Sequence, residues 1–212
     1  SSLEDLRENR IKSENKLKGV YDVCDTTHAK AIKIKNKNLN RDVDIVIANW
    51  YDDVKSVINN KEGDYRGIQV YNKDTHSKGN ADYPFLSIKR INERSTFTKG
   101  RLKKMIRFLK NVKADSSKDI KLSSFDFNAI CYDIDVDSYK DLNKFLLVPI
   151  IYNQLHKLST NSTLANNLKS VDEHEYIFRG HSEKLESLQN LMNEVNSILQ
   201  DLRPSLSPYV TR

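Results

Sequence analysis

Hydrophobic and polar residues alternate along two neighbouring stretches, which predicts two β-strands. Residues 29–35 alternate apolar with basic side chains. In residues 41–48, one strand face would carry Val43, Ile45 and Ile47, and the other Asp42, Asp44 and Val46. The polar residues 36–40 between the stretches predict a turn, so the pair would form a β-hairpin. A buried aspartate is costly unless it is paired or holds a metal. Asp44 is therefore either a solvated strand residue or a metal-binding carboxylate.

The remaining pattern of the first hundred residues is mixed. Apolar residues spaced three and four apart predict a helix over residues 3–17 that ends before Gly19. Residues 52–58 predict a short helix and residues 67–71 a strand. The polar, glycine-containing residues 72–83 predict a loop.

From residue 98 onward the apolar spacing predicts helices. Residues 98–113 carry an apolar stripe of Leu102, Met105, Ile106, Leu109 and Val112, and a basic stripe of Lys103, Arg107 and Lys110. Ser123, followed by Asp126, predicts an N-cap for the next helix. Residues 139–158 predict a helix that is bent or restarted at Pro149. A last amphipathic helix, ending at Pro204, would present Leu185, Leu188, Met192, Val195, Leu199 and Leu202.

This order predicts an α+β fold, with a small mixed or antiparallel sheet followed by an α-helical domain. We place the sheet domain at residues 1–97 and the helical domain at residues 98–212. The 212 residues suffice for one large domain or two small ones.

Composition narrows the classes of function. The net charge of +6 favours polyanionic partners such as nucleotides or nucleic acid. No apolar run approaches the roughly 20 residues that a membrane-spanning helix needs, and the N-terminus does not read as a secretory signal. We therefore expect a cytoplasmic protein without a membrane partner. Cys24 and Cys131 lie far apart, which favours reduced thiols over a disulfide framework.

Several familiar site patterns are excluded. Residues 133–139 begin like a calcium loop but lack the required glycine, and Lys144 stands where the bidentate glutamate should be. The five histidines show no zinc spacing. Neither a P-loop nor a G-x-S-x-G nucleophile elbow occurs.

An ordered series of short motifs resembles a known superfamily. These motifs lie at residues 43–48, 67–70, 83–84, 98–103, 105–110 and 122–125. The series is similar to polymerase-beta-type nucleotidyltransferases, in particular the branch of oligoadenylate synthetases and bacterial cyclic-oligonucleotide synthases. The resemblance implies a sheet palm followed by a helical domain. It also implies transfer of a nucleotidyl group from a nucleoside triphosphate to a hydroxyl, with Mg²⁺ as cofactor. A nucleotide second messenger and a role in antiviral defence would follow from the same likeness.

The resemblance assigns roles to individual residues. Asp44 would be the third catalytic carboxylate and a magnesium ligand. Lys110 would contact the donor triphosphate, with Arg107 and Lys103 adding charge nearby, and Ser124 would touch the same phosphates at a helix N-terminus. We expect Asp44 and Lys110 to face one cleft. Two plainer interpretations stay open: the basic stripe is a solvated helix face, and Ser124 is a simple cap.

The chain also departs from this superfamily. It contains no Gly-Ser dipeptide, and its D-x-D matches at Asp42, Asp133 and Asp135 lie in other contexts. The chain therefore reads as beginning after the catalytic hairpin, either as a piece of a longer enzyme or as a degenerate relative. Because one carboxylate would hold two metal ions poorly, we expect the chain to be inactive alone.

Two further classes of function remain as alternatives. The first is a catalytically inactive nucleotide- or nucleic-acid-binding module, with RNA as one partner, that uses the basic stripe and Lys30, Lys33 and Lys35. The second is a helical interaction protein that docks through the apolar stripe from Leu185 to Leu202.

Overall fold

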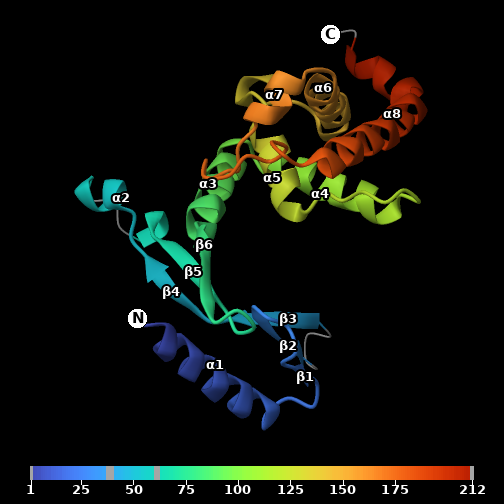
Figure 1. Cartoon of the computed structure of the whole chain (residues 1–212). Helices are drawn as coiled ribbons and strands as arrows, with labels where there is room; N and C mark the ends of the chain where they lie inside the picture. The colour runs from blue at the N-terminus through green and yellow to red at the C-terminus, as the bar shows by residue number, and fades with distance from the viewer. Residues whose placement is uncertain (1, 37–40, 60–62, 211–212) are drawn as a thin grey trace. The chain divides into compact units, whose positions relative to one another are not determined.

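The computed structural model describes residues 2–36, 41–59 and 63–210, so most of the predicted turn at 36–40 lies outside the described residues. The chain groups into two compact units, Ser1–Leu86 and Ser87–Arg212 (Figure 1). Each unit is described by itself below.

The first unit contains two three-stranded antiparallel sheets. The first sheet has the order β1-β2-β3 and consists of β1 (Cys24–Asp25), β2 (Ala31–Asn36) and β3 (Arg41–Val46). The second has the order β4-β5-β6 and consists of β4 (Ala48–Tyr51), β5 (Gly67–Asn72) and β6 (Ser77–Asp82). The Tyr71 N–H donates to the Ile47 carbonyl at 2.8 Å, where β3 passes into β4. The predicted antiparallel hairpin is thus confirmed as β2–β3.

Helix α1 (Leu3–Lys18) is attached to the first sheet through a buried arginine. Arg10 is 2% exposed, and its Nη2 donates to the carbonyls of His28 and Ala31 at 3.0 and 2.9 Å. Its Nε donates to Glu14 at 2.6 Å. Because Ala31 pairs with Val46 across β2 and β3, Arg10 links the helix directly to the hairpin that carries Asp44.

Short helices and turns complete the first unit. Helix α2 (Val54–Ile58) and the 3₁₀ turn η1 (Gly63–Tyr65) lie between β4 and β5. The predicted short helix over residues 52–58 is confirmed in shorter form.

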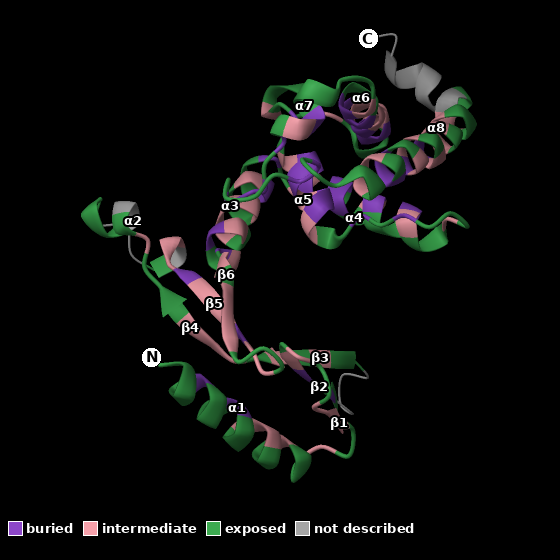
Figure 2. Cartoon of the chain, viewed as in Figure 1, coloured by how far each residue is buried: buried purple, intermediate pink, exposed green. Residues whose placement is uncertain are grey.

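The second unit is helical and holds the largest core. It comprises α3 (Pro84–Phe97), which begins in the first unit, then α4 (Arg101–Asp115), α5 (Ser124–Tyr132), α6 (Leu147–Thr160), α7 (Ser162–Asn167) and α8 (Ser182–Val210). The 3₁₀ turns η2 (Val136–Ser138) and η3 (Lys144–Leu146) precede α6. All five residues of the apolar stripe predicted on α4 are buried. They pack with residues of α5, α6 and α8, and Figure 2 shows this core as purple segments of those helices.

The predicted apolar stripe of the last helix is confirmed as core. Leu188 and Val195 are fully buried, and Leu185, Met192, Leu199 and Leu202 are partly buried against the same core. This burial contradicts the alternative of a helical protein that docks through the stripe, because the stripe is already covered within the unit.

The prediction missed two elements and misplaced the bounds of two helices. Residues 72–83 contain strand β6, whose polar sequence lacks apolar alternation although its backbone pairs with β5. Helix α3 was not predicted, because polar anchors rather than a regular apolar stripe hold it. Helix α6 begins at Leu147, so Pro149 lies in its first turn, where a missing N–H costs nothing. Helix α8 continues past Pro204 to Val210, since a proline removes one intrahelical hydrogen bond without preventing the following residues from being helical.

The predicted α+β class, a small antiparallel sheet region followed by a helical one, is confirmed. Sequence analysis assigns residues 84–97 to the first domain, whereas the structure groups most of α3 with the helical unit. None of the helices among the described residues is long and apolar enough to cross a membrane.

The buried Tyr139 allows a test of how polar burial affects the stability of the core. Its side chain is 0% exposed, its hydroxyl has no hydrogen-bond partner among the described residues, and burial raises its pKa from 10.0 to about 12. We expect Tyr139→Phe to raise the free energy of unfolding by about 1 kcal/mol at neutral pH, because it removes an unsatisfied buried polar group. The unfolded tyrosine loses its proton first, so the wild type should lose stability between pH 10 and 12, and the variant should lose less.

Chemical denaturation at pH 7 and across pH 9–12 measures both effects. The partly exposed Tyr152 provides the control, since Tyr152→Phe should change stability by less than about 0.5 kcal/mol. A clear loss of stability in Tyr139→Phe would contradict the interpretation.

Candidate functional site

Asp44 lies on the outward face of β3. Val43 and Ile45 are half-buried, whereas Asp42, Asp44 and Val46 are exposed, as the alternation predicts. Asp44 is paired in register with Lys33 of β2, and Asp42 with Lys35. Both lysines are exposed. The carboxylates thus lie on a solvated face on which each acidic residue has a basic cross-strand neighbour.

The described residues alone do not form a complete magnesium site. Asp44 offers one carboxylate, a suitable oxygen donor for Mg²⁺. However, no group of three or more His, Cys, Asp or Glu side chains among the described residues could hold a metal ion. Asp44 can therefore supply one ligand, and further ligands would have to come from elsewhere.

The helical unit contains a basic pocket of about 340 Å³ between α3, α4 and α5. Helix α4 supplies Lys103, Arg107 and Lys110, which follow each other at spacings of four and three, and all three are exposed. Its other lining residues are Ile88, Ile91 and Asn92 of α3, Ile106 of α4 and Asn128 of α5. The structure thus brings the three predicted cations to one concave surface.

Ser124 lies one helical turn from this pocket. Ser123, not Ser124, is the N-cap of α5: its Oγ accepts from the Asp126 N–H at 3.3 Å, and Asp126 Oδ2 accepts from the Ser123 N–H at 2.7 Å. Ser124 is therefore the exposed first residue of the helix, on the same face as the pocket residue Asn128 four positions later. The capping box takes up the Asp126 N–H, whereas the N–H groups of Ser124 and Phe125 have no acceptor within the helix, so this end of α5 suits an anion.

Asp126 also fixes α5 to the last helix. Its carboxylate is 0% exposed, and Oδ1 accepts from Lys184 Nζ of α8 at 2.8 Å. The capping box and the ion pair together hold the N-terminus of α5 while leaving the Ser124 side chain outside both interactions.

Asn92 and Asn128 are pocket residues that sequence reasoning missed. An isolated asparagine on a helix carries no spacing signal. For Asn128, its position four residues after Ser124 was the signal that could have revealed it.

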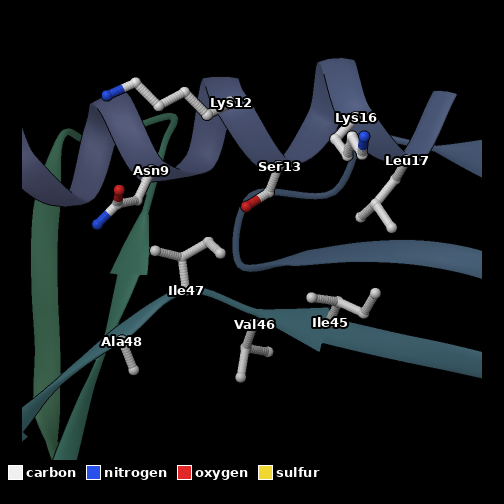
Figure 3. Close-up of a pocket in the computed structure, with 9 residues that line it drawn as sticks. All are labelled: Asn9, Lys12, Ser13, Lys16, Leu17, Ile45, Val46, Ile47 and Ala48. Atoms are coloured by element: carbon white, nitrogen blue, oxygen red, sulfur yellow. The ribbon is translucent and has the colours of Figure 1, made fainter. Parts of the chain in front are cut away.

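A second hollow, in the sheet unit, contains none of the predicted site residues. It measures about 600 Å³ and lies between α1 and residues 45–48 of the β3–β4 segment. In Figure 3, Ile47 points toward α1, and Asn9, Ser13 and Leu17 point toward the strands. Its floor is apolar and Lys12 and Lys16 come from the helix above it.

The predicted residues thus fall into two places, each within one unit. Asp44 is displayed by the sheet unit, and Lys103, Arg107, Lys110 and Ser124 cluster in the helical unit. That Asp44 and Lys110 face a common cleft stays a prediction.

A small antiparallel sheet with an outward-facing aspartate, followed by a helical unit with a basic pocket, is the arrangement that the resemblance to nucleotidyltransferases implies. Comparison with known proteins agrees with this class. The chain belongs to the cGAS/DncV-like nucleotidyltransferase family, because the profile of that family's C-terminal helical domain matches residues 89–200.

Individual relatives extend the similarity to nearly the whole chain. A c-di-GMP synthase of Capnocytophaga granulosa is 60% identical over 207 residues, which are 97% of this chain and 59% of the relative. A c-di-GMP synthase of a Lachnospiraceae bacterium is 44% identical over 95% of this chain and 58% of the relative. The chain therefore spans a little under three fifths of the length of these curated relatives.

The fold is similar as well. The solved structure of the STING-associated CdnE c-di-GMP synthase from Capnocytophaga granulosa superposes with a TM-score of 0.89 at 58% identity. The match covers 97% of this chain and 66% of that one.

The buried pair that anchors α5 can be tested by mutation. We expect Lys184→Met to lower the free energy of unfolding by about 2–3 kcal/mol, because it leaves the buried Asp126 carboxylate without its cation. Thermal and urea denaturation measure the loss. The exposed Lys118, which lies 3.6 Å from the partly buried Glu194 of α8, is the control. Lys118→Met should cost less than about 1 kcal/mol. Equal losses in the two variants would contradict the anchoring role of Asp126.

Proposed function

We propose that this chain is part of a nucleotidyltransferase that joins two nucleoside triphosphates into a cyclic dinucleotide, with GTP as substrate and c-di-GMP as product. The observation that carries the proposal is the basic pocket on α4, which lies one helical turn from Ser124, whose side chain is outside the capping contacts of α5. The substrate is suggested by relatives that are named c-di-GMP synthases and are up to 60% identical to this chain.

The pocket chemistry fits a triphosphate. Lys103, Arg107 and Lys110 bring three positive charges to one concavity, and Asn128 adds amide N–H donors. Ser124 would add its hydroxyl, and the first turn of α5 would add backbone N–H groups. Such an arrangement would hold the donor phosphates and stabilise the charge that develops on the leaving pyrophosphate.

Asp44 would act in the whole protein as one carboxylate of a magnesium site. Bound Mg²⁺ would supply activation of the attacking hydroxyl and neutralisation of phosphate charge. The residue itself would contribute a fixed oxygen ligand on a rigid strand, and the remaining ligands would come from outside the described residues. A role in signalling and antiviral defence would follow from the proposed product, and the similar Capnocytophaga granulosa enzyme is described as STING-associated.

One observation weakens the alternative of an inactive nucleic-acid-binding module. That alternative uses the basic stripe of α4 together with the basic strand, but on the strand Lys33 and Lys35 pair in register with Asp44 and Asp42. The exposed face of the hairpin therefore combines both signs of charge and offers no continuous basic track for a phosphate backbone.

The triphosphate assignment predicts a specific loss of GTP binding. Lys110→Ala should raise the Kd for GTP about tenfold or more, since it removes one charged contact to phosphate. Lys104 is exposed on the same helix but does not line the pocket, so Lys104→Ala should leave the Kd within about twofold. Calorimetric titration of GTP with Mg²⁺ measures both. Equal Kd values in the two variants would refute the assignment.

Asp42 is a matched control for Asp44, because it lies two residues away on the same strand face. In the whole protein, we expect Asp44→Asn to reduce formation of cyclic dinucleotide about a hundredfold or more, because the amide is a poor magnesium ligand. Asp42→Asn removes the same charge from the same surface and should retain most activity. Chromatographic quantification of products from GTP distinguishes the two. Similar activity in both variants would remove Asp44 from the proposed metal site.

A further inference from the structure

Helix α3 has a polar face that is separate from its pocket-lining face. Ser87, Arg90 and Arg94 follow each other at spacings of three and four, so they form one stripe along the helix. Each of the three donates a hydrogen bond to a segment outside α3. The pocket-lining face carries Ile88, Ile91 and Asn92.

The first two anchors bind the segment between α7 and α8. Ser87 Oγ donates to the buried carboxylate of Asp172 at 2.8 Å. Arg90 Nη1 donates to the Val171 carbonyl at 2.6 Å and lies 3.1 Å from Glu173. These contacts fix the first half of α3 to a connecting segment that does not line the pocket.

The third anchor binds a different partner. Arg94 Nη1 donates to the main-chain carbonyl of Tyr132, and its guanidinium stacks on the Tyr132 ring, 3.4 Å from the centroid. Tyr132 is the last residue of α5. Carbonyls at a helix C-terminus lack intrahelical partners and carry partial negative charge, so a cation there is favourable. The aromatic stacking adds a second contact to the same residue.

Helix α5 is the helix that carries Ser124 and Asn128. One end of α5 is held by Asp126 and Lys184 of α8, and the other end is held to α3 by Arg94. Among the three polar anchors of α3, Arg94 alone connects the wall that bears Asn92 with the wall that bears Asn128.

We propose that Arg94 is a positioning residue of the triphosphate pocket, which sets the separation of Asn92 on α3 from Asn128 and Ser124 on α5. This inference rests on the proposed function of that pocket. Arg94 does not line the pocket itself, so it acts through the placement of the two helices and not through contact with phosphate.

Helix α5 has supports of its own. Phe127, Ala129, Ile130 and Cys131 are all at most 1% exposed, and the Asp126–Lys184 pair remains when Arg94 is replaced. Loss of the guanidinium should therefore loosen one wall of the pocket without unfolding the unit.

The test compares Arg94→Met with Arg90→Met. Both variants remove one arginine–carbonyl bond from the same helix and keep an unbranched apolar stem. Arg94→Met should raise the Kd for GTP about tenfold, and Arg94→Lys should recover part of the loss through a single hydrogen bond to Tyr132. Arg90→Met should lower the melting temperature about as much as Arg94→Met does, but it should change the Kd for GTP by less than about threefold.

A double-mutant cycle gives a readout that a purely structural role would not affect. Asn128→Ala should raise the Kd about threefold to tenfold in the wild-type background and have little effect in the Arg94→Met background, because Asn128 is already misplaced there. Additive effects, an unchanged Kd in Arg94→Met, or equal increases in Arg94→Met and Arg90→Met would overturn the proposal.

Lys110→Ala separates this proposal from the function on which it rests. If the wild type does not bind GTP, or if Lys110→Ala binds as tightly as the wild type, the triphosphate pocket is refuted and the role of Arg94 with it. If Lys110→Ala weakens binding and Arg94→Met does not, only the positioning role is refuted.

Discussion

The N-terminus of α5 depends on one buried carboxylate, that of Asp126. Removing a charge from water is costly unless hydrogen bonds and an opposite charge compensate. Asp126 has both, since the N-cap residue Ser123 donates to it and Lys184 donates to it from α8. These interactions fix where α5 begins and which helix it faces. As a result, Ser124 becomes the first helical residue with its hydroxyl outside the capping contacts, which is the geometry an anion site needs.

Local spacing in the sequence was enough to predict the elements whose apolar residues recur regularly. The stripe of α4, the capping box at Ser123 and Asp126, and the outward-facing Asp42 and Asp44 were all confirmed. Helix α3 and strand β6 were missed because neither is organised by an apolar pattern. Hydrogen bonds to distant carbonyls and carboxylates hold α3, and backbone pairing with β5 holds β6. Contacts with such distant partners leave no pattern in the local sequence.

The candidate phosphate-binding pocket also combines residues that local spacing predicts with residues that only the packing of helices brings together. The spacing of Lys103, Arg107 and Lys110 placed them on one helix face, but only the packing of α3, α4 and α5 shows that this face borders a pocket. Asn92 and Asn128 come from the other two helices, so no single stretch of sequence could reveal their convergence. The resemblance to nucleotidyltransferases predicted that Lys103, Arg107, Lys110 and Ser124 bind phosphate, and the structure places the three cations at one pocket and Ser124 one helical turn from it. The metal assignment of Asp44 draws on that resemblance and on its exposed position.

The pairing of β2 with β3 has a consequence for how the hairpin folds. In the observed register, Ile32 and Ile34 are buried on one face, whereas Lys33 and Asp44 share the other. Sliding β3 by a single residue would exchange its two faces and turn both aspartates toward those isoleucines. Burial of unpaired carboxylates in apolar surroundings is strongly unfavourable. The acidic residues therefore protect the hairpin against misalignment during folding, in addition to any part they play in chemistry.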